Sequence, residues 1–337
     1  MRKFILLLII FFLVSTLFVS SVLAEEKMYY FISHQAPTEP FWSAVEKGWS
    51  DAIALLPGVK GEFAAPQWGH ANVPEMLGVI ESALASNPDG LAVVMSNPQM
   101  LDDPVRTAIN NGISIVAVNT IDPRPEGERI PYKTYIGENS YEMGKLAANT
   151  VIEKFKEIYG RAPKGAIFLN HAPGVVCMEL RGNGVKDACK EHGVEKIEVV
   201  EVQYDPGKVI ETVRAYTTKY KDTEIVITGA SMVSHFSAVS LKENNKLGNI
   251  NQPAKEGNVF VGGIDVNPDL LKDIMNGDVV CTVDQQPYTQ GFMAAIALYL
   301  DDTLKIAPVG NINTGPNLIL EHNAADILEQ AEKGYRG

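Results

Sequence analysis

Side chains that could bind a small molecule follow the apolar runs of this 337-residue chain, at the point where each run ends. They are carboxylates, amides, imidazoles and a hydroxyl, joined by two adjacent aromatic rings. The residues that we single out in this way are His34, Phe41, Trp42, Asn119, Glu138, Asn139, His171, Ser231, Asp265 and Gln285. Because ligands of open α/β sheets bind beyond the carboxyl ends of the strands, we expect these side chains to meet in one site.

The mixture of residue types favours a sugar or a sugar-like polyol as the ligand. Each sugar hydroxyl both donates and accepts a hydrogen bond, so carboxylates and amides can bind neighbouring hydroxyl pairs. The C–H face of a sugar ring stacks on aromatic rings, and Phe41 and Trp42 offer such a platform. In a deep site with few charges, a small number of placed polar groups fixes the orientation of the ligand.

Several of these residues also have a purely structural interpretation. Asp265 could cap the helix that follows it, and Glu138 could be an acidic residue that favours a helix N-terminus. Phe41 and Trp42 open a helix and could belong to the core. A histidine at a strand end, such as His34 or His171, is as often hydrogen-bonded structure as a ligand contact.

Sequence motifs of catalysis and cofactor binding are absent from the chain. It has no P-loop, dinucleotide fingerprint, zinc-protease motif or nucleophile elbow. The six histidines are scattered, and Cys177, Cys189 and Cys281 lack both metal-ligand spacing and the even number of a disulfide framework. We therefore predict a binding protein without catalytic residues, metal or cofactor, whose cysteines are small buried residues.

Short apolar runs alternate with amphipathic stretches along the chain. The expected strands span 28–32, 59–63, 91–95, 113–118, 135–137, 166–169, 197–202, 224–228, 259–262 and 279–283. The expected helices span 41–56, 75–86, 105–110, 143–158, 180–192, 209–220, 233–242, 269–276 and 289–300. Continuously apolar strands that alternate with helices indicate parallel sheets covered on both faces. These are too many units for one sheet of ordinary width, so we predict two Rossmann-like, doubly wound lobes.

The N-terminus reads as a cleaved secretory signal peptide. Arg2 and Lys3 precede an apolar run over 4–19, and small residues lead to Ala24. The run is shorter than the ~20 residues that a spanning helix needs, so we expect residues 1–24 to be removed and the protein to leave the cytoplasm. The net charge of −12 argues against nucleic acid or an anionic membrane as a partner.

Five segments, in order, resemble the type I periplasmic sugar-binding proteins of ABC transporters, the family of the ribose-, galactose- and xylose-binding proteins. They are 37–48 (PTEPFWSAVEKG), 87–93 (NPDGLAV), 112–119 (GISIVAVN), 261–268 (VGGIDVNP) and 282–291 (TVDQQPYTQG). The resemblance implies two lobes joined by a three-segment hinge, which close on the ligand. We place one lobe at 25–138 plus 286–313 and the other at 139–285 plus 314–337.

The resemblance also implies roles for individual residues. Phe41 and Trp42 would stack on the ligand, while Asn119, Asp265 and Gln285 would hydrogen-bond to it. Arg181 would match the arginine of the family that reaches ring and hydroxyl oxygens, with Glu179 as the alternative alignment. The implied protein is a periplasmic monomer that hands its ligand to a membrane permease.

Two departures from the family pattern bear on the ligand. Asn119-Thr120 stands where the ribose-binding proteins have Asp-Arg, and Ala230-Ser231 where they have Asn-Asp. We therefore do not expect ribose itself, and a cyclitol such as myo-inositol stays open. The alternative functions are a chemosensory or quorum-signal receptor of the same fold, a two-lobed enzyme, and the effector domain of a transcription regulator. The predicted signal peptide disfavours the last.

Overall fold

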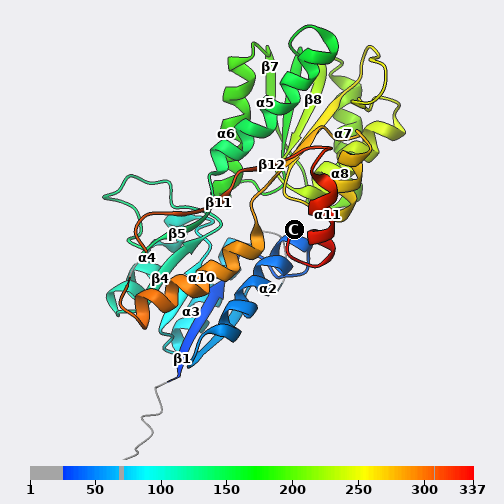
Figure 1. Cartoon of the computed structure of the whole chain (residues 1–337). Coiled ribbons are helices and arrows are strands. Elements are labelled where there is room, and N and C mark those ends of the chain that lie inside the picture. Colours follow the sequence, from blue (N-terminus) through cyan, green and yellow to red (C-terminus); the bar gives the residue numbers. More distant parts are fainter. Residues whose placement is uncertain (1–25, 68–71, 307) are drawn as a thin grey trace, which may run out of the picture.

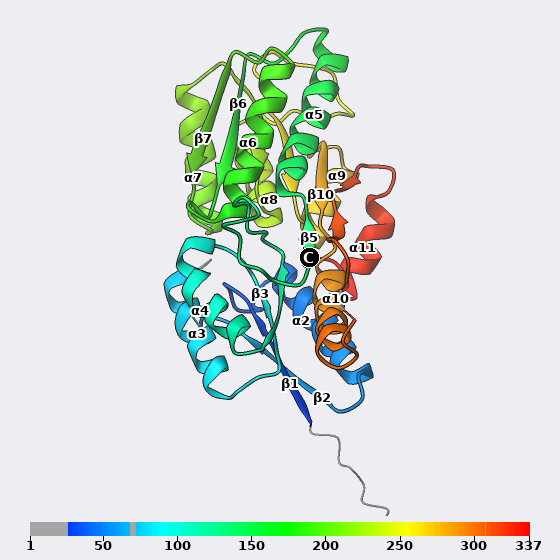
Figure 2. The same cartoon turned by 90° about the vertical axis from the view of Figure 1, so that its left-hand side faces the viewer.

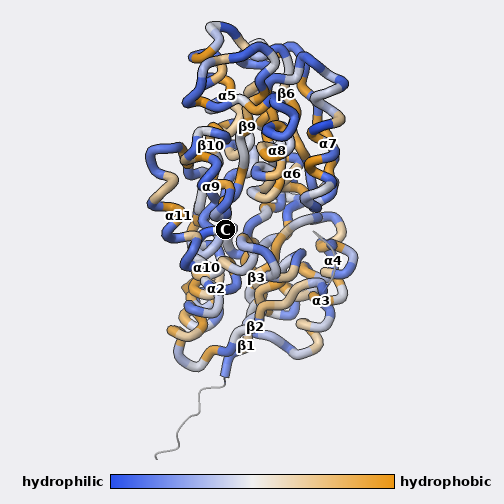
Figure 3. The backbone as a smooth tube through the Cα atoms, turned by 90° about the vertical axis from the view of Figure 1, so that its right-hand side faces the viewer, coloured by the Kyte–Doolittle hydropathy of each residue, from blue (hydrophilic) through white to orange (hydrophobic). Residues whose placement is uncertain are grey.

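Two α/β halves, one above the other, make up the computed structural model, which describes residues 26–67, 72–306 and 308–337 (Figure 1). Each half is built on its own six-stranded sheet with helices on both faces. Hydrophobic segments, orange in Figure 3, run through both halves. The predicted signal peptide at 1–24 lies outside the described residues. No helix within the described ranges combines the length and the apolar character needed to span a bilayer.

The N-terminal lobe is the half that contains the strand order β11-β5-β4-β3-β1-β2, with all neighbours parallel. Its strands are β1 (Lys27–Ile32), β2 (Val59–Ala64), β3 (Gly90–Val93), β4 (Ser114–Val118), β5 (Tyr135–Glu138) and β11 (Ile312–Gly315). Its helices are α2 (Pro40–Leu55), α3 (Val73–Ala85), α4 (Pro98–Asn110) and α10 (Pro287–Asp302). Figure 2 shows α3 and α4 on one side of this sheet and α2 and α10 on the other. Every residue of β3 and β4 is consequently buried.

The C-terminal lobe contains the strand order β12-β10-β9-β8-β6-β7, parallel except for β12, which runs antiparallel to β10. Its strands are β6 (Gly165–Asn170), β7 (Lys196–Glu201), β8 (Thr223–Thr228), β9 (Phe260–Ile264), β10 (Cys281–Asp284) and β12 (Asn317–Ile319). Its helices are α5 (Ser140–Tyr159), α6 (Val176–Glu191), α7 (Pro206–Lys219), α8 (Ser231–Glu243), α9 (Pro268–Met275) and α11 (Ala324–Glu332). One apolar core lies under α5 and α6, and a second under α7, α8 and α9.

The prediction of two doubly wound lobes is confirmed. In each sheet the strand order reverses beside the first strand of that sheet, which creates the switch point where ligands of such folds bind. The chain passes between the lobes three times: after β5, after β10, and between β11 and β12. We propose that the lobe boundaries lie at these crossings; the boundary that we placed after 313 falls inside β11.

Five other elements differ from expectation. Helix α4 contains the expected segment 105–110 and begins earlier, at Pro98, because Asn97 caps it by accepting a hydrogen bond from the amide of Met100 at 3.1 Å. The strand expected at 279–283 begins later, at Cys281. Strands β11 and β12 and helix α11 were not predicted, since β11 and β12 are four and three residues long and carry no clear apolar pattern.

Candidate functional site

A cavity lies between the two lobes, at the carboxyl ends of strands from both sheets. Its empty volume is about 500 Å³, counting the solvent at its mouth. It is lined by His34, Gln35, Glu39, Phe41, Trp42, Asn119, His171, Ala172, Val175, Cys177, Met178, Arg181, Tyr204, Gly229, Ala230, Ser231, Asp265 and Gln285. All predicted site residues except Glu138 and Asn139 are therefore brought together here.

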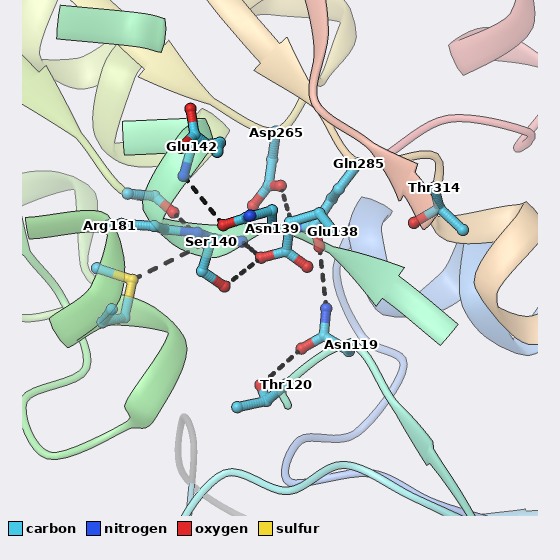
Figure 4. Close-up of polar contacts among 12 residues, drawn as sticks. Asn119, Thr120, Glu138, Asn139, Ser140, Glu142, Arg181, Asp265, Gln285 and Thr314 are labelled. Atoms are coloured by element: carbon cyan, nitrogen blue, oxygen red, sulfur yellow. Dashed lines mark hydrogen bonds and ion pairs between the residues drawn. The ribbon is translucent and has the colours of Figure 1, made fainter. Parts of the chain in front are cut away.

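A hydrogen-bonded row of side chains joins the two lobes at the floor of the cavity. Gln285 donates from Nε2 to Oδ1 of Asp265 at 2.5 Å, and Asn119 donates from Nδ2 to Oε1 of Gln285 at 3.0 Å (Figure 4). Asn119 comes from the N-terminal sheet, Asp265 from the C-terminal sheet, and Gln285 from the crossing between them. Asn267, rather than Asp265, caps α9, so the capping role considered for Asp265 does not apply.

The Arg181 guanidinium lies against the cavity and is held from behind by Glu138. Its Nη2 donates to Oε1 of Glu138 at 2.9 Å, and its Nη1 donates to the carbonyl of Gly229 at 3.1 Å. The Ser140 hydroxyl also donates to Glu138, at 2.7 Å. With 4% of Arg181 and 1% of Glu138 exposed, this is a buried ion pair. Glu138 thus positions Arg181 instead of lining the cavity.

Asn139 does not reach the cavity. Its side chain is exposed, and its Oδ1 accepts a hydrogen bond from the amide of Glu142 at 3.2 Å, which caps α5. A polar side chain directly after a strand can either bind a ligand or cap the next helix, and Asn139 caps α5.

Two aromatic rings enter the cavity from the first turn of α2. The ring centroids of Phe41 and Trp42 are 5.0 Å apart at an interplanar angle of 84°, and the His34 ring meets Trp42 edge-on at 5.1 Å. Glu39 caps this helix by accepting from the amides of Trp42 and Phe41 at 3.3 and 3.4 Å. The helix start thus presents two apolar faces beside a carboxylate, a combination that suits a ring with hydroxyls.

Direct contacts between the lobes enclose the cavity. The Tyr204 hydroxyl of the C-terminal lobe donates to Oε2 of Glu39 at 3.5 Å. The amide of Val176, at the start of α6, donates to the carbonyl of Ser96 beyond β3 at 3.1 Å. The lobes therefore stand in a closed arrangement around the cavity.

Sequence reasoning missed Glu39 and Tyr204 as cavity residues. Glu39 stands before the first helical residue, Pro40, so its position signalled only a helix cap. Tyr204 lies three residues beyond β7, as Ser231 does beyond β8, but it was not among the side chains predicted from the strand ends. Cys177 and Met178 also line the cavity, from α6. All three cysteines are buried free thiols, in keeping with the expectation of small buried residues.

Two buried polar atoms of the cavity lining have no hydrogen-bond partner among the described residues. They are Nε of Arg181 and Oε1 of Gln35. Arg181 is 4% exposed and Gln35 is 6% exposed. A buried donor or acceptor without a partner is costly, so native proteins rarely leave one. Here a ligand with both donors and acceptors would satisfy one of each.

Two carboxyls of the cavity hold protons more tightly than usual. Burial raises the pKa of Asp265 to about 7, although Arg181 opposes the shift. Burial likewise raises the pKa of Glu39 to about 7, against the amides of Trp42 and Phe41 and the Tyr204 hydroxyl. Within the described ranges neither carboxyl forms an ion pair, and Arg181 is paired with Glu138.

These shifts predict that the ligand-free protein loses stability as the pH rises. Between about pH 4 and pH 7 the folded protein binds protons that the unfolded chain releases, so the free energy of unfolding falls through this window and levels off above it. The melting temperature of the ligand-free protein should therefore fall between pH 5 and pH 7.5, and Glu39→Gln should reduce that fall. Calorimetry across this range tests the prediction, with the exposed Glu142→Gln as control. An unchanged slope in Glu39→Gln would contradict it.

Comparison with known proteins places the chain in a family. Residues 29–300 match the periplasmic binding protein domain. The chain is 27% identical over 309 residues to the xylose/arabinose-binding protein XylF of Sulfolobus acidocaldarius. The aligned region covers 88% of this chain and 72% of that protein.

Solved structures share the architecture. A carbohydrate transporter of Acidothermus cellulolyticus, in complex with myo-inositol, matches 92% of this chain and 100% of its own with a TM-score of 0.78 at 24% identity. A periplasmic sugar-binding protein of Legionella pneumophila matches 86% and 99% with a TM-score of 0.75 at 26% identity. The family consists of solute-binding proteins rather than enzymes. With its two lobes, three crossings and interlobe cavity, this chain belongs to the periplasmic binding protein domain family.

Proposed function

We propose that this protein is the extracytoplasmic solute-binding component of an ABC importer, which binds a monosaccharide or a cyclitol such as myo-inositol between its lobes. The observation that carries the proposal is the composition of the cavity, which combines two aromatic rings with amide, carboxylate and guanidinium groups. Sugar rings need both surfaces at once. The similarity to a xylose/arabinose-binding protein and to a carbohydrate transporter in complex with myo-inositol supports the same ligand class.

Within this proposal each side chain has a role. Phe41 and Trp42 stack on the C–H face of the ring, while Asp265, Asn119 and Gln285 bind hydroxyls. Arg181 donates from its unpartnered Nε, and His34, His171 and Ser231 contact the remaining polar atoms. Because these groups come from both lobes, the ligand stabilises the closed arrangement relative to the open one.

The protein then delivers its ligand to a membrane permease, acting as a monomer outside the cytoplasm after removal of residues 1–24. The alternative is a receptor of the same fold that reports ligand occupancy to a membrane sensor. Deleting the gene separates the two functions. An importer component is required for uptake of the ligand, whereas a sensor component is required only for the cellular response to it.

A thermal-shift screen of the mature protein tests the proposal directly. The panel contains pentoses, hexoses, 6-deoxyhexoses and cyclitols. A ligand that binds only the folded protein raises the melting temperature, because it adds to the free energy of unfolding a term that grows with the logarithm of the ligand concentration relative to Kd. At a ligand concentration of 100 times Kd this term is about 2.7 kcal/mol. We expect a strong shift with one stereochemical class. No shift with any member of the panel would refute the sugar assignment.

A further inference from the structure

Residues 334–337 lie between the two lobes, beside the cavity. They follow α11, which packs against α9 in the C-terminal lobe. Figure 1 places this end of the chain next to the start of α2, where the lobes meet, and Figures 2 and 3 show it at the same junction. We call residues 334–337 the strap.

The strap contacts the N-terminal lobe along α2 and α10. The Tyr335 ring meets the Tyr288 ring edge-on, with centroids 5.1 Å apart, and Nζ of Lys47 lies 5.1 Å from the centroid of Tyr335. Gly337 is buried against the backbone that begins α2. A Cβ on Gly337 would stand 2.2 Å from the carbonyl oxygen of Pro40 and 2.5 Å from Cα of Phe41, so only glycine fits this approach.

The strap contacts the C-terminal lobe through its last two residues. The carbonyl of Gly337 accepts a hydrogen bond from the amide of Val266 at 3.2 Å. The Arg336 guanidinium forms an ion pair with the carboxylate of Asp284, whose side chain is 1% exposed. Arg336 also donates from Nε to Oε1 of Gln330 in α11, at 3.0 Å, which fixes the direction of its side chain.

Three of these contacts fall on or next to a residue of the cavity. Gly337 touches Phe41 itself, Val266 follows Asp265, and Asp284 precedes Gln285. Phe41 belongs to the N-terminal lobe, Asp265 to the C-terminal lobe, and Gln285 to the crossing. One four-residue segment therefore contacts the chain at or beside three groups that must converge on one ligand.

We propose that the strap is a positioning element of the ligand site, which sets the spacing of Phe41, Asp265 and Gln285 and favours the closed arrangement of the lobes. The proposal rests on the proposed function for the nature of the ligand, and on the contacts above for the mechanism. Opening the lobes moves the start of α2 away from Val266, so the strap cannot keep its contacts with both. A protein whose closed form is less populated binds its ligand more weakly in proportion.

The test uses Gly337→Val, because a side chain at this position must push the strap away from Pro40. Gly127→Val is the matched control, since a Cβ at Gly127 meets nothing within 4 Å. We expect Gly337→Val to weaken binding of the sugar found in the screen by about tenfold or more, with the melting temperature of the ligand-free protein nearly unchanged. Arg336→Met should weaken binding too, and Arg336→Lys, which keeps the charge beside Asp284, should weaken it less.

Hydrogen exchange of the ligand-free protein provides a readout that needs no ligand. In Gly337→Val, peptides that cover 39–43, 264–267 and 284–286 should exchange faster than in the wild type, while the central strands stay protected. Unchanged exchange in these peptides would overturn the proposal that the strap holds these segments in place. Faster exchange with unchanged sugar affinity would overturn the proposal that the strap positions the ligand-binding side chains. If the wild type binds no sugar, the proposed function fails, and the exchange result alone decides for or against the strap.

Discussion

Replacing Arg181 by methionine should lower the melting temperature by roughly 5–8 °C and abolish ligand binding. The substitution leaves the Glu138 carboxylate buried with the Ser140 hydroxyl but without its cation. Breaking a buried ion pair by removing one partner costs about 3–5 kcal/mol, because the remaining charge stays desolvated. With an unfolding entropy of ~2.1 cal/mol/K per residue, each kcal/mol corresponds to about 1.5 °C in Tm for a chain of roughly 310 residues.

The double variant Arg181→Met/Glu138→Gln separates the two effects. It removes both charges, so much of the lost stability should return, while binding stays absent because no guanidinium faces the ligand. Arg214→Met is the matched control: its ion pair with Glu243 is about half exposed, and such surface pairs contribute ~0–1 kcal/mol. Calorimetry and titration with the sugar measure both quantities. An Arg181→Met protein as stable as the wild type would show that Glu138 does not depend on this pair.

The fold was predictable because its signals are local and repeated. Strands such as β3 and β4, buried on both faces, must be continuously apolar, and the amphipathic helices between them must cover a parallel sheet. The boundary elements were not predictable in this way. Strands β11 and β12 owe their existence to pairing with β5 and β10, which are distant in sequence.

The site was predictable to the extent that the rule of strand ends applies. Asp265 and Asn119 directly follow β9 and β4, and both take a left-handed backbone conformation, with φ of 67° and 61°. Tyr204 and Glu39 meet only because the lobes close, so nothing local to either residue marks it as a cavity residue. Asn139 also directly follows a strand, but it caps α5 and does not reach the cavity. The sequence alone does not show which neighbour a polar side chain will bind.

Asp265→Asn should affect the stability of the ligand-free protein and its affinity for the ligand in opposite directions. The buried Asp265 carboxyl, whose pKa is raised to about 7, is costly in the folded protein whenever it is ionised. Asparagine has the same shape, can still accept from Nε2 of Gln285, and carries no charge to desolvate. We therefore expect the ligand-free variant to melt at a higher temperature than the wild type at pH 8, and at nearly the same temperature at pH 4.

Binding should change in the opposite direction. Hydrogen bonds to a charged group contribute about 1.5–3 kcal/mol each, and each 1.4 kcal/mol is about tenfold in Kd. If Asp265 binds two hydroxyls of the sugar, Asp265→Ala should weaken affinity by about 100-fold or more and Asp265→Asn by less. Asp269→Ala, at an exposed carboxylate in the first turn of α9, is the control and should bind as the wild type does.

The two measurements together distinguish a ligand contact from a structural residue. A structural carboxylate contributes to stability, so its removal lowers the melting temperature and affects affinity only indirectly. A carboxylate kept for its ligand does the reverse, because its desolvation is offset only when the ligand's hydroxyl groups donate to it. Weaker binding with higher stability in Asp265→Asn would show that Asp265 binds the ligand. Lower stability with unchanged affinity would show that Asp265 has a structural role instead.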